Sequence, residues 1–389
     1  MYLMGFQETA AEQELRTELR AYFAHLRDEL GIDRRGAPGE DSAGFRAAIR
    51  RLGQDGWLGI GWPKDVGGQG RSARDQFIMF DEVQRAGFPF PFVTVNTVGP
   101  TLMRFGTDEQ KQRFLPGILA GEINVAIGYT EPGAGTDLAS LRTSARLDGE
   151  TWIVNGSKVF TSGANQADFI WLACRTEPDA PKHRGISMLM VPTDAAGFRC
   201  TPIVTVGDIV TTSTYYDDVR VPADNLVGGR DEGWRMITTQ LNHERVGLAA
   251  LGGAAWRLWG EVRTWARENG RTKLPWVQTD LAECYARLEA MSLLNAQMVD
   301  AIAEDRLEPQ QASTAKFYGT ETHVFVYRKL LGVLGAPGWL RPGSPGAALY
   351  GDVERYARSA QINTFGGGVN EVQREIVAAA GLGMVRRPR

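Results

Sequence analysis

The hydrophobic and polar positions of this chain follow three successive patterns. Up to about residue 120, apolar residues recur every three or four positions, as in EQELRTELRAYFAHLRDEL and SARDQFIMFDEVQRAG, which predicts amphipathic helices. Thr107 followed by Gln110 indicates a capping box at the start of one helix. From about 123 to 227, short β-branched and aromatic runs such as TWIVNG and DFIWLACRT alternate with turn residues. Helical spacing returns from about residue 231 to the end.

This order predicts an α+β protein with three units: helices in 1–122, a β unit in 123–228 and helices in 229–389. Asp148-Gly149 indicates a tight turn between two strands. The Gly- and Pro-rich stretch 334–348 is expected to be a connection inside the last unit.

One helical stripe in the last unit contains a carboxylate. Its members, spaced three and four apart, are Trp234, Ile237, Leu241, Glu244, Leu248, Leu251, Ala255 and Leu258. Glu244 is the single charged member, and no cation lies one turn away on the same helix. Burial would raise its pKa from about 4.3 toward the range of a general base. An ion pair with an Arg of another helix explains the same pattern equally well.

Two glycine-rich segments are candidate ligand loops. YTEPGAGTD (129–137) lies between strand-like runs and offers hydroxyls and open backbone N–H groups, although a plain connector has the same composition. NTFGGGVNEVQREIVAAAG (363–381) places glycines before a helix for which Asn370 is the predicted N-cap. A flexible hinge is the competing interpretation of this second segment.

Composition narrows the function class. A net charge of −3 and a pI of 5.9 argue against nucleic-acid binding, and no apolar run is long enough for a membrane span. The N-terminus becomes acidic before any signal-like apolar core, so we expect a cytoplasmic protein. Cys174, Cys200 and Cys284 lack metal-ligand spacing and are expected to be small apolar residues of the core, with no metal site.

Taken together, YTEPGAGTD, VNGSKVFTSGANQADFIWLACRT (154–176) and the helix start NEVQRE resemble the signature segments of the acyl-CoA dehydrogenase family. The resemblance covers essentially the whole chain. It implies an N-terminal helical domain, a middle β-barrel and a C-terminal four-helix bundle, with FAD between barrel and bundle. It also implies an acyl-CoA substrate and an electron-transfer flavoprotein as acceptor.

The resemblance assigns most of the candidate site residues. Thr130, Gly135 and Thr136 would line the flavin and the CoA pyrophosphate side, with Thr136 also facing substrate. Phe160 stands where the family often has Trp against the flavin ring, and the Ser162 hydroxyl would approach flavin N5. The remaining residues that the resemblance places at the cofactor are Ile127, Tyr129, Val369 and Glu371.

The chemistry implied is removal of the substrate α-proton by a base while a hydride passes from the β-carbon to flavin N5. Many members have that base in a Tyr-Glu-Gly-Thr pattern, where this chain has Gly367. The isovaleryl- and long-chain-type enzymes have it instead in an L-x-x-E-R pattern, which matches Leu241 to Arg245 and assigns Glu244. Gly367 would offer its N–H to the thioester carbonyl and leave room for a bulky acyl group. Asn242 and Arg245 would then lie on the substrate side, and a purely structural Arg245 fits equally well.

A second departure concerns the part of the flavin site that family members lend to a neighbouring subunit. Segments 265–281 and 329–339 lack the family's R-x-x-F-G and Gln-x-x-Gly-Gly-x-Gly patterns. The combination resembles the actinobacterial α2β2 acyl-CoA dehydrogenases of steroid side-chain breakdown, in which a related chain completes each FAD site. We therefore hypothesise a heterotetramer and a bulky or branched substrate such as a steroid side-chain CoA ester.

Two alternatives stay open at this point. The chain is a non-catalytic or half-site subunit that supports an active partner, or it is an acyl-CoA oxidase that uses O2, because a fold alone does not fix the electron acceptor.

Overall fold

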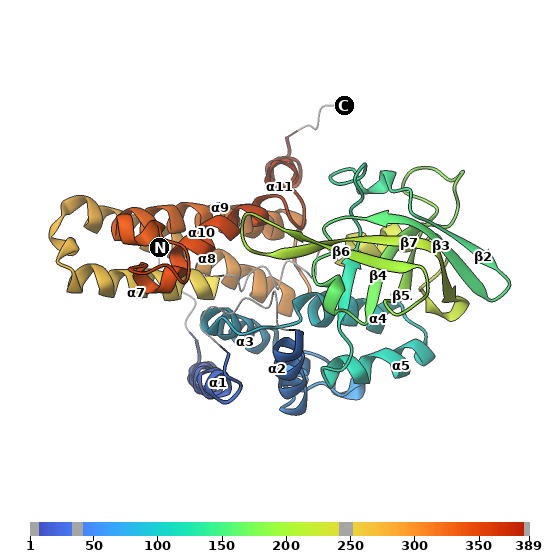
Figure 1. The fold of residues 1–389 in the computed structure, drawn as a ribbon, viewed down its shortest axis with the longest axis horizontal. Helices are drawn as coiled ribbons and strands as arrows, with labels where there is room; N and C mark the ends of the chain where they lie inside the picture. The colour runs from blue at the N-terminus through green and yellow to red at the C-terminus, as the bar shows by residue number, and fades with distance from the viewer. Residues whose placement is uncertain (1–7, 33–41, 241–251, 385–389) are drawn as a thin grey trace.

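The computed structural model describes residues 8–32, 42–240 and 252–384. Three blocks follow one another along the chain (Figure 1): N-terminal helices, a curved β-sheet at one end of the molecule, and long C-terminal helices that extend away from it. The predicted α+β class is therefore confirmed.

The N-terminal block is built from amphipathic helices. They are α1 (Ala10–Glu29), α2 (Ser42–Gln54), α3 (Ala73–Ala86), α4 (Gly99–Phe105) and α5 (Asp108–Leu119), with a π-helical turn at Thr94–Val98 before α4. The predicted capping box is confirmed at α5, where the Gln110 amide donates to the Thr107 hydroxyl over 3.2 Å and the Thr107 amide donates to the Gln110 side chain over 3.1 Å.

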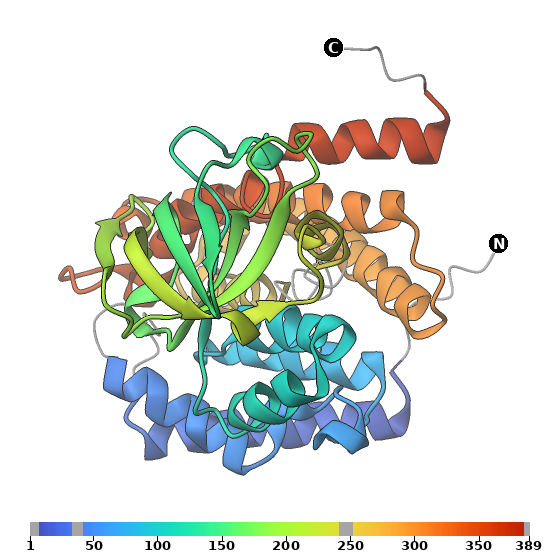
Figure 2. The same ribbon diagram turned by 90° about the vertical axis from the view of Figure 1, so that its right-hand side faces the viewer.

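The middle block is a mixed sheet. Its strands are β1 (Val125–Gly128), β2 (Ser144–Asp148), β3 (Thr151–Lys158), β4 (Phe169–Arg175), β5 (Ile186–Pro192), β6 (Phe198–Val204), β7 (Val210–Pro222) and β8 (Leu226–Val227). They run in the order β6-β7-β3-β2-β4-β5-β8, and β1 pairs in parallel with β4. The predicted Asp148-Gly149 turn joins β2 to β3, with Gly149 at a φ of 61°. Figure 2 shows these strands curving around one another above the N-terminal helices.

The C-terminal block begins with a helical segment over 233–240 and continues with long helices. Those described are α7 (Gly252–Glu268), α8 (Pro275–Ala303), α9 (Pro309–Leu334), α10 (Asp352–Ser359) and α11 (Asn370–Ile376). Three described members of the predicted stripe are buried, since Ile237 is 1% exposed and Ala255 and Leu258 are fully buried, whereas Trp234 is only partly buried. Leu241, Glu244, Leu248 and Leu251 lie outside the described residues.

Apolar packing joins the three blocks. One buried cluster extends from α1 and α3 to Trp171 and Met188 of the sheet and to Met298 and Val299 of α8. Separate clusters fill the bundle and the interior of the sheet. The predicted domain boundaries fall between α5 and β1 and just after β8, and the division at residues 122 and 228 stays a prediction.

Two cysteines behave as core residues. Cys174 and Cys284 are fully buried, and burial raises the pKa of each thiol to about 12, so both stay protonated near neutral pH. Cys200 is partly exposed on β6. Over the described ranges, no helix combines the length and the apolar character that crossing a bilayer requires.

Candidate functional site

The loop 129–137 is held in place at its first residue. Tyr129 follows β1 directly, and its hydroxyl accepts a hydrogen bond from the Trp171 indole over 3.1 Å. The same hydroxyl donates to Gln240, the last described residue of the segment 233–240. Tyr129 therefore links the loop both to β4 and to the helical segment 233–240.

A buried ion pair fixes the next part of the loop. The Lys158 ammonium lies 2.8 Å from the Glu131 carboxylate and donates to the Tyr129 carbonyl over 3.0 Å; the Lys158 side chain is fully buried. Glu131 also accepts backbone hydrogen bonds from Arg142 and Thr143. Burial acts to raise the Glu131 pKa, but Lys158 and Thr143 outweigh it and hold the pKa below its usual range. The carboxylate is therefore a structural anion that shapes the loop.

The end of β3 is brought beside this loop. The Val159 amide donates to the Thr130 carbonyl over 2.8 Å, which puts Thr130 next to Phe160. Phe160 has a φ of 60° and exposes 61% of its surface. A left-handed backbone is a strained conformation for a bulky residue, and such residues concentrate at functional sites. Phe160 is therefore both conformationally strained and accessible at its surface.

Ser162 is oriented by the neighbouring strand. Its amide donates to the Phe160 carbonyl over 3.0 Å, and its hydroxyl donates to Thr211 of β7 over 2.9 Å. Thr161, between them, is fully buried and bonded to Thr212. The buried residue anchors the turn, while Phe160 and Ser162 remain accessible on either side of it.

The cluster formed by Thr130, Gly135, Phe160 and Ser162 fits a planar, polar-edged ring such as a flavin. A methyl group at Gly135 would lie 3.9 Å from the Thr130 methyl carbon, so these two residues are adjacent. Phe160 offers an apolar face, and the hydroxyls of Thr130 and Ser162 offer hydrogen bonds at a ring edge. Thr136 is exposed further along the loop, and Ile127 is partly buried on β1.

The second glycine-rich segment lies against α9. Gly366, Gly367 and Gly368 are exposed, with a φ of 65° at Gly367 and 98° at Gly368. Val369 is the residue preceding α11, and Glu371 is exposed in its first turn. The prediction of Asn370 as N-cap is wrong, because Val369 occupies that position. The Asn370 side chain instead points inward and hydrogen-bonds Lys316 and Thr320 of α9.

Glu244, Asn242 and Arg245 lie outside the described residues, between the segment 233–240 and α7. Their assignment rests on the sequence pattern.

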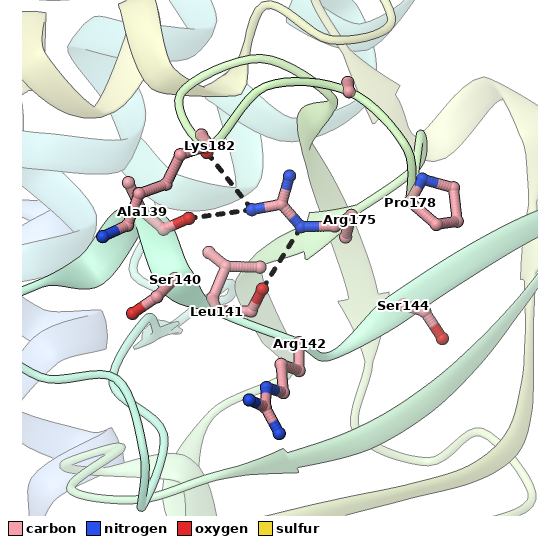
Figure 3. Close-up of a pocket in the computed structure, with 9 residues that line it drawn as sticks. Ala139, Ser140, Leu141, Arg142, Ser144, Arg175, Pro178 and Lys182 are labelled. Carbon is pink, nitrogen blue, oxygen red and sulfur yellow. Dashed lines mark hydrogen bonds between the residues drawn. The ribbon is translucent and has the colours of Figure 1, made fainter.

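A pocket of about 340 Å³ opens beside the far end of the first loop (Figure 3). Its walls come from the segment 139–144 and from β4 and the loop after it, and include Arg142, Arg175 and Lys182. Arg175 is part of the scaffold, since its guanidinium donates to the carbonyls of Ala139 and Leu141. Lys182 forms an ion pair with Asp137, the last residue of the loop. The pocket is therefore a cationic hollow that continues the loop.

Residue-by-residue inspection of the sequence missed the Lys158–Glu131 pair and this cationic pocket. The sequence does hint at Lys158. It is an even number of residues from Trp152 and Val154, so strand alternation places it on the same buried face of β3, where a charged residue is unexpected. The pocket has no comparable signal, because its residues come from segments more than thirty positions apart.

Family models match nearly the whole chain. The N-terminal domain of acyl-CoA dehydrogenases matches residues 9–122, the middle domain 126–219 and the C-terminal domain 231–382.

Individual relatives agree with these matches. The chain is 48% identical to acyl-CoA dehydrogenase FadE26 of Mycobacterium tuberculosis, over 99% of this chain and 100% of FadE26. It is 46% identical to FadE29 of the same organism, over 98% of this chain and 99% of FadE29. Two solved structures are also similar. A chain of the Tcur3481-Tcur3483 steroid ACAD is 60% identical with a TM-score of 0.95, over 99% of this chain and 100% of that one. A chain of the ChsE4-ChsE5 complex from Mycobacterium tuberculosis is 48% identical with a TM-score of 0.92, over 99% and 100%.

Proposed function

This chain belongs to the acyl-CoA dehydrogenase family, and from that premise we propose that it catalyses FAD-dependent α,β-desaturation of an acyl-CoA thioester. Members of the family are generally FAD-dependent oxidoreductases. The single observation that supports the proposal most strongly is the exposed, left-handed Phe160 beside Thr130 and Ser162, because this cluster suits a flavin ring.

Each candidate residue has a role in this proposal. FAD, when bound, supplies the acceptor for the substrate's β-hydride. Phe160 would contact the flavin ring through its apolar face, and the hydroxyls of Thr130 and Ser162 would hydrogen-bond its polar edge. Ile127, Tyr129, Val369 and Glu371 would complete the surroundings of the cofactor. Glu244 removes the α-proton. The Gly367 N–H polarises the thioester carbonyl, where charge develops as that proton leaves.

Binding of the CoA portion is assigned to the end of the first loop. Thr136 is exposed there, and the hollow lined by Arg142 and Lys182 follows it. A CoA diphosphate is anionic and favours such cationic surroundings. Asn242 and Arg245 are proposed on the acyl side.

The proposed substrate has a bulky or branched acyl group, such as a steroid side-chain CoA ester. Gly367 provides no side chain where many relatives have Glu, so more room is available for the acyl group. One of the most similar solved structures is described as a steroid ACAD. We also propose an α2β2 complex with a related chain, because both similar structures are named as assemblies of two different chains. An electron-transfer flavoprotein is the proposed acceptor, and the cytoplasm the proposed location.

Glu244→Gln tests the mechanism in the complex with the partner chain. The amide keeps the size of the side chain but cannot accept the proton, so we expect turnover of an acyl-CoA panel to fall roughly 100- to 10,000-fold. FAD content and substrate binding should stay near wild type. Glu268→Gln, an exposed carboxylate at the end of α7, is the matched control and should leave turnover unchanged.

Unchanged turnover in Glu244→Gln would remove this residue from the mechanism and favour a supporting role for the chain. The acceptor is tested separately: ferrocenium or an electron-transfer flavoprotein should support turnover, and faster turnover with O2 would indicate an oxidase.

A further inference from the structure

Lys316 of α9 is a buried cation that hydrogen-bonds the glycine-rich segment 364–368. Only 4% of the residue is exposed. Its ammonium donates to the Gly368 carbonyl over 2.6 Å and to the Thr364 carbonyl over 3.4 Å. A third bond, of 2.7 Å, reaches the side-chain oxygen of Asn370. One side chain thus contacts both ends of the segment that contains Gly367.

The segment needs such an anchor. Consecutive glycines at 366–368 have more conformations to lose than any other sequence, and two of them adopt left-handed backbone angles. Within the segment, the Gly366 amide donates to the Ile362 carbonyl over 2.8 Å, whereas the Gly367 amide has no acceptor among the described residues. The conformation that leaves this amide available must be imposed from outside the segment.

The residues around Lys316 are connected by further hydrogen bonds. Asn370 is 3% exposed and donates to Thr320 and to Glu321, one turn further along α9. Arg374 of α11 forms an ion pair of 2.6 Å with the same Glu321. A buried ammonium is costly unless oxygens surround it, so the ammonium and the fixed carbonyls stabilise each other. Helix α9 therefore determines both where α11 starts and how the glycine segment is bent.

We propose that Lys316 is a positioning residue that holds the 364–368 segment so that the Gly367 N–H meets the substrate's thioester carbonyl. This inference rests on the proposed function. It means that Lys316, which lies outside the substrate site, controls how strongly the thioester carbonyl is polarised. Lys316 itself does not contact the substrate. Its removal should therefore affect ligands that have the carbonyl oxygen more than ligands that lack it.

The test compares Lys316→Met with Lys329→Met in the complex of this chain with its partner. Lys329 lies on the same helix, is partly exposed and pairs with Asp280 and Glu283, away from the glycine segment. Two ligands of equal chain length are used: a saturated acyl-CoA thioester and the matching S-alkyl-CoA thioether, which lacks the carbonyl. We expect Lys316→Met to weaken thioester binding about tenfold, which corresponds to the loss of one hydrogen bond between the neutral Gly367 amide and the thioester carbonyl, with thioether binding unchanged. Lys329→Met should change neither.

Hydrogen exchange of the segment 362–370 gives a readout that does not depend on activity. We expect exchange there to accelerate about tenfold in Lys316→Met and to stay at the wild-type rate in Lys329→Met. Asn370→Ser removes one acceptor of Lys316 and should shift both readouts in the same direction, which keeps the test available if Lys316→Met does not fold.

Equal weakening of both ligands, or unaltered exchange in the segment, would overturn the proposal. Failure of the proposed function is a different result: the wild-type complex would then not desaturate any thioester, whereas the exchange comparison would still report on the segment.

Discussion

At the scale of single residues, the buried pair of Lys158 and Glu131 has the clearest energetic consequence. Both side chains are almost completely shielded from solvent, with 0% of Lys158 and 9% of Glu131 exposed. The pair joins the end of β3 to the loop 129–137, so it holds the two halves of the proposed flavin surface together. Removing one partner leaves the other charge buried and uncompensated, which costs more than the pair itself contributes.

Lys158→Met should lower the free energy of unfolding by roughly 3 kcal/mol and reduce FAD affinity, because the loop loses its attachment to β3. Thermal unfolding and flavin fluorescence measure the two effects. Lys273→Met, an exposed control, should have little effect. Adding Glu131→Leu to Lys158→Met should recover part of the stability, and a double variant less stable than the single one would contradict this account.

The same pair gives a pH dependence with a definite sign. The pKa of Glu131 is lower in the folded protein than its unfolded value of about 4.3, so the contribution to stability is complete above that pH and is lost as the pH falls through the folded pKa. In Glu131→Gln the free energy of unfolding should therefore lose less on acidification than in the wild type, which acid-unfolding curves of the two proteins measure.

At the scale of elements, the β6–β7 hairpin is attached to the bundle. A Cβ at Gly207, in the hairpin turn, would lie 2.8 Å from the Cα of Ser359 in α10, so the two backbones touch. Arg358 donates to the Val206 carbonyl and pairs with Asp208 of the turn and Glu354 of α10. Because β7 also contains Thr211, the partner of Ser162, the bundle supports the strand that orients a proposed flavin contact.

Arg358→Gln should release the hairpin turn from α10 and destabilise the fold by about 2 kcal/mol, since Glu354 is left buried without its cation while Asp208 is partly solvated. Hydrogen exchange over 204–210 should rise sharply. Arg267→Gln, exposed at the end of α7, should leave exchange in the hairpin as it is. If the hairpin of Arg358→Gln stays protected from hydrogen exchange, backbone packing at Gly207 is sufficient to hold the hairpin turn against α10.

At the scale of the whole molecule, large apolar side chains are exposed on the bundle. Trp276, Trp339 and Tyr350 expose 45%, 61% and 68% of their surfaces. Trp276 and Trp339 lie in the segments 265–281 and 329–339, where the family's patterns for lending half a flavin site are missing. The proposed partner chain would supply that half.

We expect this chain, co-expressed with its related partner, to form an α2β2 complex with one FAD for each pair of chains. Native mass spectrometry and the flavin-to-protein absorbance ratio measure both quantities. Expressed alone, the chain should retain little FAD, because the proposed site is incomplete. A fully flavinylated, active homotetramer of this chain alone would contradict the proposal.

The sequence by itself determined the elements whose causes are local. Helical and strand periodicity predicted the helix–strand–helix order, and Thr107 with Gln110 predicted a helix start that the structure confirms. The helical stripe predicted burial correctly at Ile237, Ala255 and Leu258, because apolar residues at helical spacing leave a single face to bury. The signature segments identified the family.

Only the tertiary structure decided which polar groups meet. Lys158 and Glu131 are 27 positions apart, and Lys316 and Asn370 are 54 positions apart. Asn is a favoured N-cap residue, yet the Asn370 side chain does not cap its own helix. It accepts a hydrogen bond from the buried Lys316 and donates one to Thr320, both on α9. Local propensity cannot anticipate such a choice, because the free energy of a buried polar group depends on acceptors that another element brings to it.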